Sequence, residues 1–325
     1  NGVYEYDGKK LTHYNSSNGL SDNMISALIE DKKGNIWIGT RYDGVNKFDG
    51  KSFTHFSEKN GLSNNKINDI IEDSHGNIWI ATAGGGVNKL NEAGFSQPLK
   101  AEEFGNSRVR PIMKDNSGKL WFGTEEGGVY QYTGTGISKF SFGKASTMHG
   151  LRSMHADRIG NLWFGKTDGG GFFKYDGKQF FHFPEKRTQD IQSIYSILED
   201  RSGNIWYSRF KDGITKMNET SQLTYSYGKK EGLISNKIFT IFEDRKGIIW
   251  MGTEGGGVMK FDGNTGFTFY TEREGLFCKS VTSIIEDKNG NQVMISGGRN
   301  IADGYFGKSP EDRGSLLPIY EDSDI

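Results

Sequence analysis

The sequence of 325 residues predicts an all-β protein: a seven-bladed β-propeller with four antiparallel strands per blade. Three observations lead to this prediction. A short motif returns along the chain at a nearly fixed interval, each repeat divides into four short apolar segments, and each end of the chain carries part of a repeat. A period of roughly 40 residues with four strands per repeat is typical of propeller blades.

The repeated motif is clearest between Glu30 and Thr40, which read EDKKGNIWIGT, and it returns between Glu72 and Thr82 as EDSHGNIWIAT. Its tryptophan, or the residue in the same place, stands at Trp37, Trp79, Trp121, Trp163, Trp206, Trp250 and Val293. These positions are 42 to 44 residues apart, so the chain contains seven repeats. Because each repeat is expected to contact only its neighbours, such an array escapes the size limit of a single core.

The first half of a repeat predicts two strands joined by a tight turn. Met24–Glu30 is rich in isoleucine and too short for a helix, so we expect a buried strand. The second strand is expected over Ile36–Thr40. Between them, Gly34 can adopt the left-handed conformation of a tight hairpin, and Asp31 can accept hydrogen bonds from the turn amides.

The second half of a repeat predicts another hairpin. The third strand is expected over Val45–Phe48 and the fourth over Ser52–Phe56, with Asp49 and Gly50 as the turn. Asp-Gly between apolar segments is a strong signal for a two-residue hairpin turn, and it recurs in three other repeats. Each repeat is therefore expected to form one four-stranded blade.

The ends of the chain predict how the ring closes. Asn1–Tyr14 matches the third and fourth strands of a repeat, whereas Ser280–Ile295 supplies the first and second strands of the seventh. The two partial repeats are therefore expected to combine into one blade. We expect a single propeller over residues 1–307, followed by a polar tail over residues 308–325.

Composition excludes several classes of protein. A net charge of -1 and a pI near 6.7 argue against a partner that is a nucleic acid or an anionic membrane, because such binders carry excess positive charge. The single cysteine, Cys278, excludes an intramolecular disulfide and a cysteine-rich metal site. No stretch approaches the ~20 apolar residues of a membrane-spanning helix, so we expect no membrane span in this chain. Because the chain starts at Asn1 and not at Met, we expect a mature or trimmed form.

A phrase that precedes the motif indicates a family. Residues 18–25, 60–67 and 231–238 read NGLSDNMI, NGLSNNKI and EGLISNKI, and each precedes Glu-Asp-x-x-Gly-x-Ile-Trp. Together with Gly-Thr-x-x-Gly-Gly-Val, these segments resemble the two-component regulator propeller repeat, although the third to fifth repeats lack the phrase. The resemblance implies a periplasmic or extracellular sensor module, often of a hybrid histidine kinase that detects carbohydrates. It implies a small-molecule ligand such as an oligosaccharide, and a signalling or surface protein as a partner.

Residues that break the repeat are the candidates for a ligand site. In propellers, the loops that join the fourth strand to the next first strand, and the second strand to the third, usually line the mouth of the central channel. The second position of the first strand carries Ser26, Asn68, Arg110, Arg152, Tyr195, Phe239 and Thr282 in the seven repeats. The loops after the second strands add Arg41, Tyr42, Glu125, Glu126, Asp168, Arg209, Lys211 and Glu254.

These residues predict binding of an anionic or polyhydroxylated small ligand. Arginine can grip a carboxylate or sulfate through two hydrogen bonds, and aromatic faces can stack on sugar rings. Arg110 and Arg152 are expected on adjacent blades, with Tyr195 on the blade that follows. The alternative is that these arginines pair with carboxylates such as Glu125 or Asp168 and only fill the channel.

The residues that recur in every blade are expected to be structural, since a site residue is needed once. The histidines of the outer strands, His13, His55 and His182, are expected to pack at blade edges, and His155 in the core. No catalytic, cofactor or metal-binding motif is recognisable, so we predict no cofactor and no metal. An enzyme similar to virginiamycin B lyase is the main alternative, with His149 and Glu125 or Glu126 as a loose match. A protein-binding scaffold is the third.

Overall fold

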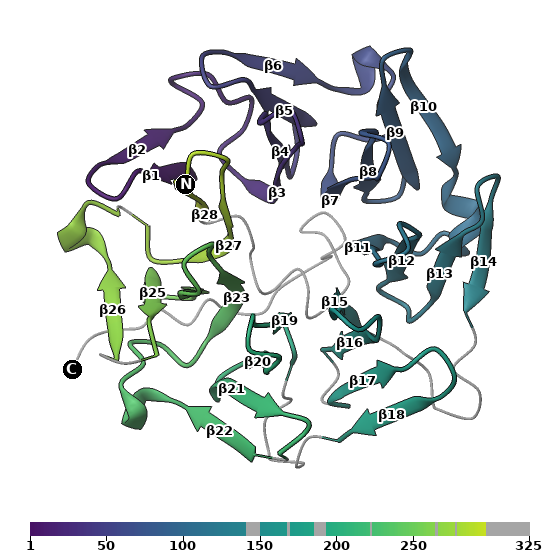
Figure 1. The fold of residues 1–325 in the computed structure, drawn as a ribbon. Helices are drawn as coiled ribbons and strands as arrows, with labels where there is room; N and C mark the ends of the chain where they lie inside the picture. Colours follow the sequence, from purple (N-terminus) through teal and green to yellow (C-terminus); the bar gives the residue numbers. More distant parts are fainter. Residues whose placement is uncertain are drawn as a thin grey trace, which may run out of the picture.

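The computed structural model of the chain is a ring of seven four-stranded antiparallel sheets around a central axis (Figure 1). It describes residues 1–140, 150–167, 170–184, 193–221, 223–263, 266–276 and 278–296. The predicted seven-bladed β-propeller is confirmed. The predicted boundary between residues 307 and 308 lies outside the described residues.

Six blades are built from consecutive strands, which we call inner, second, third and outer in order from the axis. Blade one contains β3 (Ile25–Glu30), β4 (Ile36–Thr40), β5 (Val45–Phe48) and β6 (Phe53–Phe56). Blade two contains β7 (Ile67–Glu72), β8 (Ile78–Thr82), β9 (Val87–Asn91) and β10 (Gly94–Leu99). Blade three contains β11 (Val109–Lys114), β12 (Leu120–Thr124), β13 (Val129–Tyr132) and β14 (Ile137–Phe140).

The next three blades follow the same plan. Blade four contains β15 (Leu151–Ala156), β16 (Leu162–Lys166), β17 (Phe172–Tyr175) and β18 (Phe180–Phe183). Blade five contains β19 (Ile197–Glu199), β20 (Ile205–Arg209), β21 (Gly213–Asn218) and β22 (Leu223–Tyr227). Blade six contains β23 (Ile238–Glu243), β24 (Ile249–Thr253), β25 (Val258–Phe261) and β26 (Phe267–Tyr270). Short 3-10 helices follow four outer strands: η1 (Glu58–Asn60), η2 (Ala101–Phe104), η3 (Lys229–Glu231) and η4 (Glu272–Glu274).

Blade seven joins the two ends of the chain. Its inner and second strands are β27 (Val281–Glu286) and β28 (Gln292–Ser296), and its third and outer strands are β1 (Gly2–Tyr6) and β2 (Leu11–Tyr14). β1 pairs antiparallel with β28, with Tyr4 opposite Met294. The predicted closure of the ring is therefore confirmed, and Figure 1 shows the purple and yellow strands side by side in one sheet.

One aspartate holds the turn between the inner and second strands. In blade one, Asp31 Oδ1 accepts the backbone N–H of Asn35 at 2.8 Å, and Oδ2 accepts the indole N–H of Trp37 at 2.7 Å. Gly34 takes the predicted left-handed conformation, with a φ of 81°. Burial raises the pKa of Asp31, but the hydrogen bonds from Trp37, Asn35 and the turn amides outweigh burial and lower the pKa overall.

The same tryptophans fill the space between neighbouring blades. Trp37 is 4% exposed and clusters with Leu62, Ile67 and Ile70 of blade two. Trp206 of blade five is 1% exposed and clusters in the same way with residues of blade six. Because an aromatic side chain of this size buries about 150–250 Å², these contacts are a large part of what holds the blades together. The expected inter-blade role of the tryptophans agrees with this packing.

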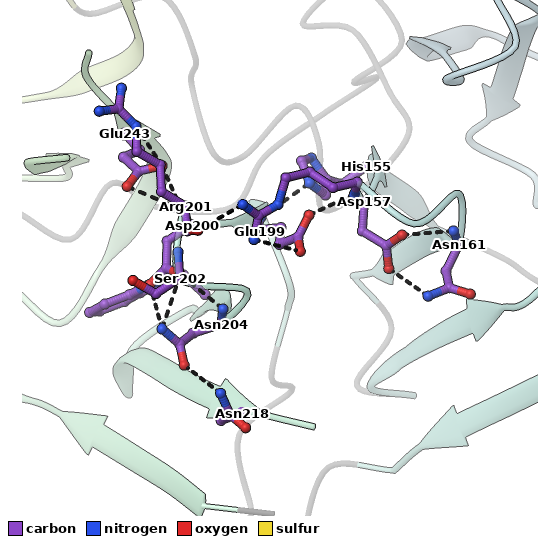
Figure 2. A network of polar contacts seen from close by, with 12 residues as sticks. His155, Asp157, Asn161, Glu199, Asp200, Arg201, Ser202, Asn204, Asn218 and Glu243 are labelled. Carbon is purple, nitrogen blue, oxygen red and sulfur yellow. Dashed lines mark hydrogen bonds and ion pairs between the residues drawn. The ribbon is translucent and has the colours of Figure 1, made fainter. Parts of the chain in front are cut away.

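A glutamate at the end of the inner strand links each of five blades to the preceding one. We call this side of the ring the turn face; it is formed by residues 31–35 and their equivalents. Figure 2 shows one of these links, in which the backbone N–H of Arg201 donates to Glu243 at 3.0 Å. In the same way, the backbone N–H of Arg158 donates to Glu199 at 2.7 Å. The other donor–acceptor pairs are Lys32 with Glu72, Arg245 with Glu286, and Lys288 with Glu30.

Blades three and four lack this glutamate and are joined by other contacts. Lys114 stands at its place in blade three, and its Nζ donates to the carbonyl oxygen of Glu72 at 3.1 Å. Ala156 stands there in blade four, and Asn116 of blade three instead donates its side-chain N–H to the carbonyl oxygen of Asp157 at 2.8 Å. The ring of glutamate links is thus interrupted at blades three and four, two of the three blades whose repeats lack the phrase before the motif.

Candidate functional site

The side of the ring opposite the turn face is formed by two segments of each blade. We call it the variable face: it comprises the segments that lead into the inner strands and the loops that follow the second strands. One backbone hydrogen bond of 2.8 to 3.1 Å joins the two segments, from the first loop residue to the carbonyl oxygen before the inner strand. The donor–acceptor pairs are Arg41–Met24, Ala83–Lys66, Glu125–Arg108, Thr167–Gly150, Phe210–Ser193 and Glu254–Lys237.

The second residue of the inner strand lies at an irregularity of the sheet. In blade one the pairing passes from Ile25–Thr40 to Ala27–Gly39, so Ser26 is left out of the ladder. The same shift in register falls at Asn68, Arg110, Arg152, Phe239 and Thr282. A β-bulge turns a side chain out of the regular alternation and is common at the rims of barrels and beside binding sites. In six blades the predicted column of candidate residues therefore coincides with a bulge, whereas Tyr195 of blade five lies just before β19.

On blade three, Arg110 lies against a carboxylate. Arg110 Nε is in ion-pair contact with Glu125 Oε1, and Arg108 Nη1 lies 3.8 Å from Glu125 Oε2. The side chains of Arg110 and Glu125 are 20% and 27% exposed, so solvent screens the pair only partly. This contact is the one expected if Arg110 serves to fill the channel. Two arginines nevertheless share one glutamate, which leaves a local excess of positive charge.

On blades four to six, Arg152 lies on a group of aromatic rings. We call Tyr195, Phe210 and Phe239 the aromatic cluster. Arg152 Cζ is 5.1 Å from the centroid of the Tyr195 ring, and the Tyr195 centroid is 5.1 Å from that of Phe210 and 5.6 Å from that of Phe239. Phe210 and Phe239 are each 6% exposed, whereas Tyr195 is partly exposed. Tyr195 is therefore the member of the cluster that solvent reaches.

A second cation lies on the same cluster. Lys237 Nζ is 5.8 Å from the centroid of Phe210 and 3.2 Å from Glu254 Oε2. Each cation–π contact contributes about 0.5–1 kcal/mol where it is exposed. The cluster thus carries positive charge from blades four and six, with Glu254 as the carboxylate beside Lys237.

The remaining predicted residues lie elsewhere on the variable face. Arg41 Nε donates to the hydroxyl of Tyr42 at 3.2 Å, and Tyr42 is 49% exposed. Arg209 donates from Nη2 to Ser226 Oγ on outer strand β22 at 3.2 Å, so its side chain extends toward the rim of blade five. Lys211 is exposed and has a φ of 73°. Asp168 lies outside the described residues.

Sequence reasoning missed three residues that contact the predicted ones: Arg108, Phe210 and Lys237. A signal for each was present in the repeat. Phe210 occupies the same loop position as Arg41, Glu125 and Glu254. Its charged neighbours Arg209 and Lys211 were the more obvious candidates in the sequence. Arg108 and Lys237 both stand just before an inner strand, at a position that also differs from blade to blade.

His155 agrees with its expected role in the core. Its Nε2 accepts the backbone N–H of Glu199 at 3.1 Å, which places the acceptor lone pair on that nitrogen (Figure 2). Burial lowers the pKa of His155, opposed in part by Glu199 and Asp157. A neutral imidazole therefore belongs to the structural network of the turn face.

The outer-strand histidines also make structural contacts. The His13 ring stacks on Tyr4 and the His182 ring stacks on Phe173, while His55 Nδ1 lies 2.6 Å from Asn46 Oδ1. His149, the residue invoked for a lyase, lies outside the described residues. Among the residues that the structure describes, no group of three His, Cys, Asp or Glu side chains could hold a metal ion.

The fold and its two faces together define the class: a propeller with a largely repeated turn face and a variable face where charged and aromatic side chains meet. Three segments, residues 19–42, 61–84 and 232–255, match the model of the two component regulator propeller family. The resemblance to this repeat is thereby confirmed in blades one, two and six. A comparison with curated proteins gives no match.

Solved structures with the same fold come from several functional classes. The extracellular domain of a putative hybrid two-component system of B. thetaiotaomicron is 21% identical with a TM-score of 0.71, and the match covers 87% of this chain and 41% of that one. Virginiamycin B lyase from Staphylococcus aureus is 11% identical with a TM-score of 0.69, covering 86% and 97%. PorZ, a surface component of the type-IX secretion system of Porphyromonas gingivalis, is 15% identical with a TM-score of 0.67, covering 89% and 48%.

These similarities establish the fold and leave the activity open. The chain spans less than half the length of the two-component extracellular domain that it matches. No helix within the described residues is long and apolar enough to cross a membrane.

Proposed function

We propose that the protein is a sensor propeller that works outside the cytoplasm, binds a small ligand at its variable face, and serves two-component signalling. The ligand is an anionic or polyhydroxylated molecule, with a saccharide as the first candidate. The family match at residues 19–42, 61–84 and 232–255 supports the signalling role. The two-component relative is an extracellular domain, which supports the location.

The observation that carries the proposed ligand class is Arg152 on the aromatic cluster. The Tyr195 ring orients the guanidinium, which lies 5.1 Å from its centroid. A guanidinium held this way is prepared to bind a carboxylate or sulfate, and the exposed part of an aromatic side chain is suited to the apolar face of a sugar. Phe210 and Phe239 pack against the Tyr195 ring, so the Tyr195 side chain loses little conformational freedom when a ligand binds.

Arg152→Ala tests the site directly. The variant is expected to weaken ligand binding by about 1.5–3 kcal/mol, the range for hydrogen bonds to charged groups. Ligands are found on a glycan array and affinities are measured by calorimetry on the intact chain. The matched control is Arg245→Ala, which removes the same charge on the turn face and should leave affinity unchanged. Equal affinity in all three proteins would refute the proposed site.

Arg110→Ala separates the ligand role from the structural role on blade three. Because Arg110 contacts Glu125, the change leaves a partly buried carboxylate without this partner. A lower melting temperature with unchanged affinity would assign Arg110 to the channel alone. A loss of affinity with unchanged melting temperature would extend the ligand site from blade four to blade three.

The same screen distinguishes the two other functions that the sequence leaves open. Chemical turnover of a bound molecule would favour an enzyme of the virginiamycin B lyase type. Binding confined to a macromolecule, with no response to small ligands, would favour a protein-binding scaffold. Reversible binding of a small ligand without turnover supports the sensor.

A further inference from the structure

Blade seven differs from the other blades at two positions that face each other. In blade one, Trp37 on the second strand lies opposite Lys47 on the third strand, and Lys47 Nζ lies 5.6 Å from the indole ring. The equivalent lysines of blades two, four, five and six lie 5.3 to 5.7 Å from their tryptophans. In blade seven, Val293 lies opposite Glu5. The indole has been lost and the cation that covers it has been replaced by an anion.

A cavity of about 160 Å³ lies where the indole would be. In blade one, Trp37 shares a cluster with Ile78, Ile80, Leu90 and Phe95 of the next blade. The equivalent residues next to Val293 are Ile36, Ile38, Phe48 and Phe53 of blade one, and all four line the cavity. The cavity is therefore the space of one missing tryptophan, at the junction where the chain closes its ring.

Both aromatic and acidic side chains line the cavity. Tyr14 occupies the place of Phe56, on which Trp37 stacks at 5.7 Å between centroids, and Tyr14 also lines the cavity. Asp287 and Glu5 also line the cavity, and the Tyr14 hydroxyl donates to Glu5. Asp287 Oδ2 accepts N–H groups from Asn291 at 3.0 Å and from Asn289 at 3.2 Å. The Asn289 contact takes the place of the indole N–H, which lies 2.7 to 2.9 Å from the aspartate in the other six blades.

We propose that this cavity binds a small planar aromatic molecule that carries an N–H donor, about the size of indole. Its ring lies on Tyr14, between Val293 and the side chains of blade one, and its N–H donates to Asp287 in place of the longer Asn289 contact. A cavity of about 150 Å³ that is lined by apolar side chains can take up benzene. Here Val293 and the four side chains of blade one supply the apolar part of the lining, and Asp287 supplies the acceptor. Gly34, Lys288 and Asn289 of the turn face border the cavity, as do Asp49 and Gly50 of the hairpin between β5 and β6.

The charges around the cavity select among such molecules. Glu5, Asp287 and Asp49 line it together with one cation, Lys288. Burial and the neighbouring Glu5 raise the pKa of Tyr14 to about 12, so its hydroxyl stays protonated and donates to Glu5 at 3.0 Å. Three carboxylates and one lysine give the lining a net negative formal charge. Neutral or cationic aromatic N–H donors are favoured, and aromatic carboxylates are disfavoured.

Calorimetry with indole on the intact chain tests the proposal. Indole is expected to bind once per chain and to bind about threefold to tenfold more tightly than indene, which has the same shape without the donor. Indole-3-acetate is expected to bind more weakly than either. Methyl NMR signals of Ile36 and Ile38 should shift on addition of indole, because both side chains line the cavity.

Val293→Trp supplies the decisive comparison. The introduced side chain fills the cavity and should abolish indole binding while raising the melting temperature. The control is Tyr225→Trp, which adds the same side chain at a position that is 54% exposed on β22 and should leave binding intact. If Val293→Trp fails to fold, Val293→Phe and the isoleucine methyl shifts of the unmodified protein give the answer. Indole binding that persists in a folded Val293 variant, or no shift at Ile36 and Ile38 at saturating indole, would overturn the proposal.

Discussion

The two faces of the ring differ in how far their side chains repeat from blade to blade. On the turn face, the aspartate accepts an indole N–H at 2.7 to 2.9 Å in six blades, and a glutamate accepts a backbone N–H of the preceding blade in five links. On the variable face, the backbone geometry repeats but the side chains do not. The same loop position carries Arg41, Ala83, Glu125, Thr167, Phe210 and Glu254.

This difference indicates how stability and recognition are divided. A contact that recurs from blade to blade stabilises the ring, and a different side chain at that position would weaken it. A position whose backbone is fixed by a hydrogen bond and a bulge, and whose side chain is free to change, can differ in each blade at little cost to the ring. Substitutions on the two faces should therefore act on different measured quantities.

The largest expected effect comes from removing residues 1–14, which breaks the seam between the first and last blades. The deletion removes β1 and β2 and leaves β28 as an unpaired edge. We expect the cooperative melting transition to be lost and aggregation to increase, as followed by circular dichroism and light scattering. Adding residues 1–14 as a peptide should restore part of the transition. A truncated chain that melts like the intact one would contradict this closure.

A smaller but still large loss of stability is expected from Trp206→Ala, which removes a side chain packed between two blades. Trp206 is 1% exposed and packs against blade six. Its removal should lower the free energy of unfolding by about 3–5 kcal/mol, through lost burial and a residual cavity. Chemical denaturation measures the change. Tyr42→Ala on the variable face, where the side chain is 49% exposed, is the control and should change stability by at most about 0.5 kcal/mol.

The smallest effect concerns His155, which links blade four to blade five on the turn face. Because burial lowers its pKa in the folded protein, the unfolded chain binds more protons below its ordinary pKa of about 6.5. Stability should therefore fall as the pH drops below that value. His155→Gln, which keeps an acceptor for the Glu199 N–H, should show a shallower fall between about pH 6.5 and 5. His75→Gln, an exposed position, should follow the parent, and identical slopes in all three proteins would rule out this source of pH dependence.

Most of the fold could be predicted because it depends on local signals that recur. The predicted bounds of the second and third strands of blade one, Ile36–Thr40 and Val45–Phe48, are those of β4 and β5. The predicted inner strand began one residue early, since Met24 is the carbonyl partner of Arg41 in the variable-face hydrogen bond. The closure could be predicted because half a repeat stands at each end.

The candidate site could be predicted only in part. The repeat placed Arg110, Arg152 and Tyr195 in one column, and Arg152 does lie on Tyr195. Which side chains meet on the variable face depends on rotamers and bulges that the repeated motif does not encode. Within blade three Glu125 contacts Arg110, and within blade five Arg209 donates to Ser226 on the outer strand.

The pairing of β1 with β28 also determines when blade seven can form during synthesis. Asn291 and Glu5, hydrogen-bonded within blade seven, are separated by 286 positions of the chain. Synthesis at about 5–20 residues per second would leave β1 and β2 without their neighbour for roughly 15–60 s. Blades one to six can pack on one another during that interval. The ring stays open, and β1 keeps one edge unpaired until β28 has been made. We therefore expect late completion of one sheet, more than the stability of any single blade, to limit folding and to favour aggregation.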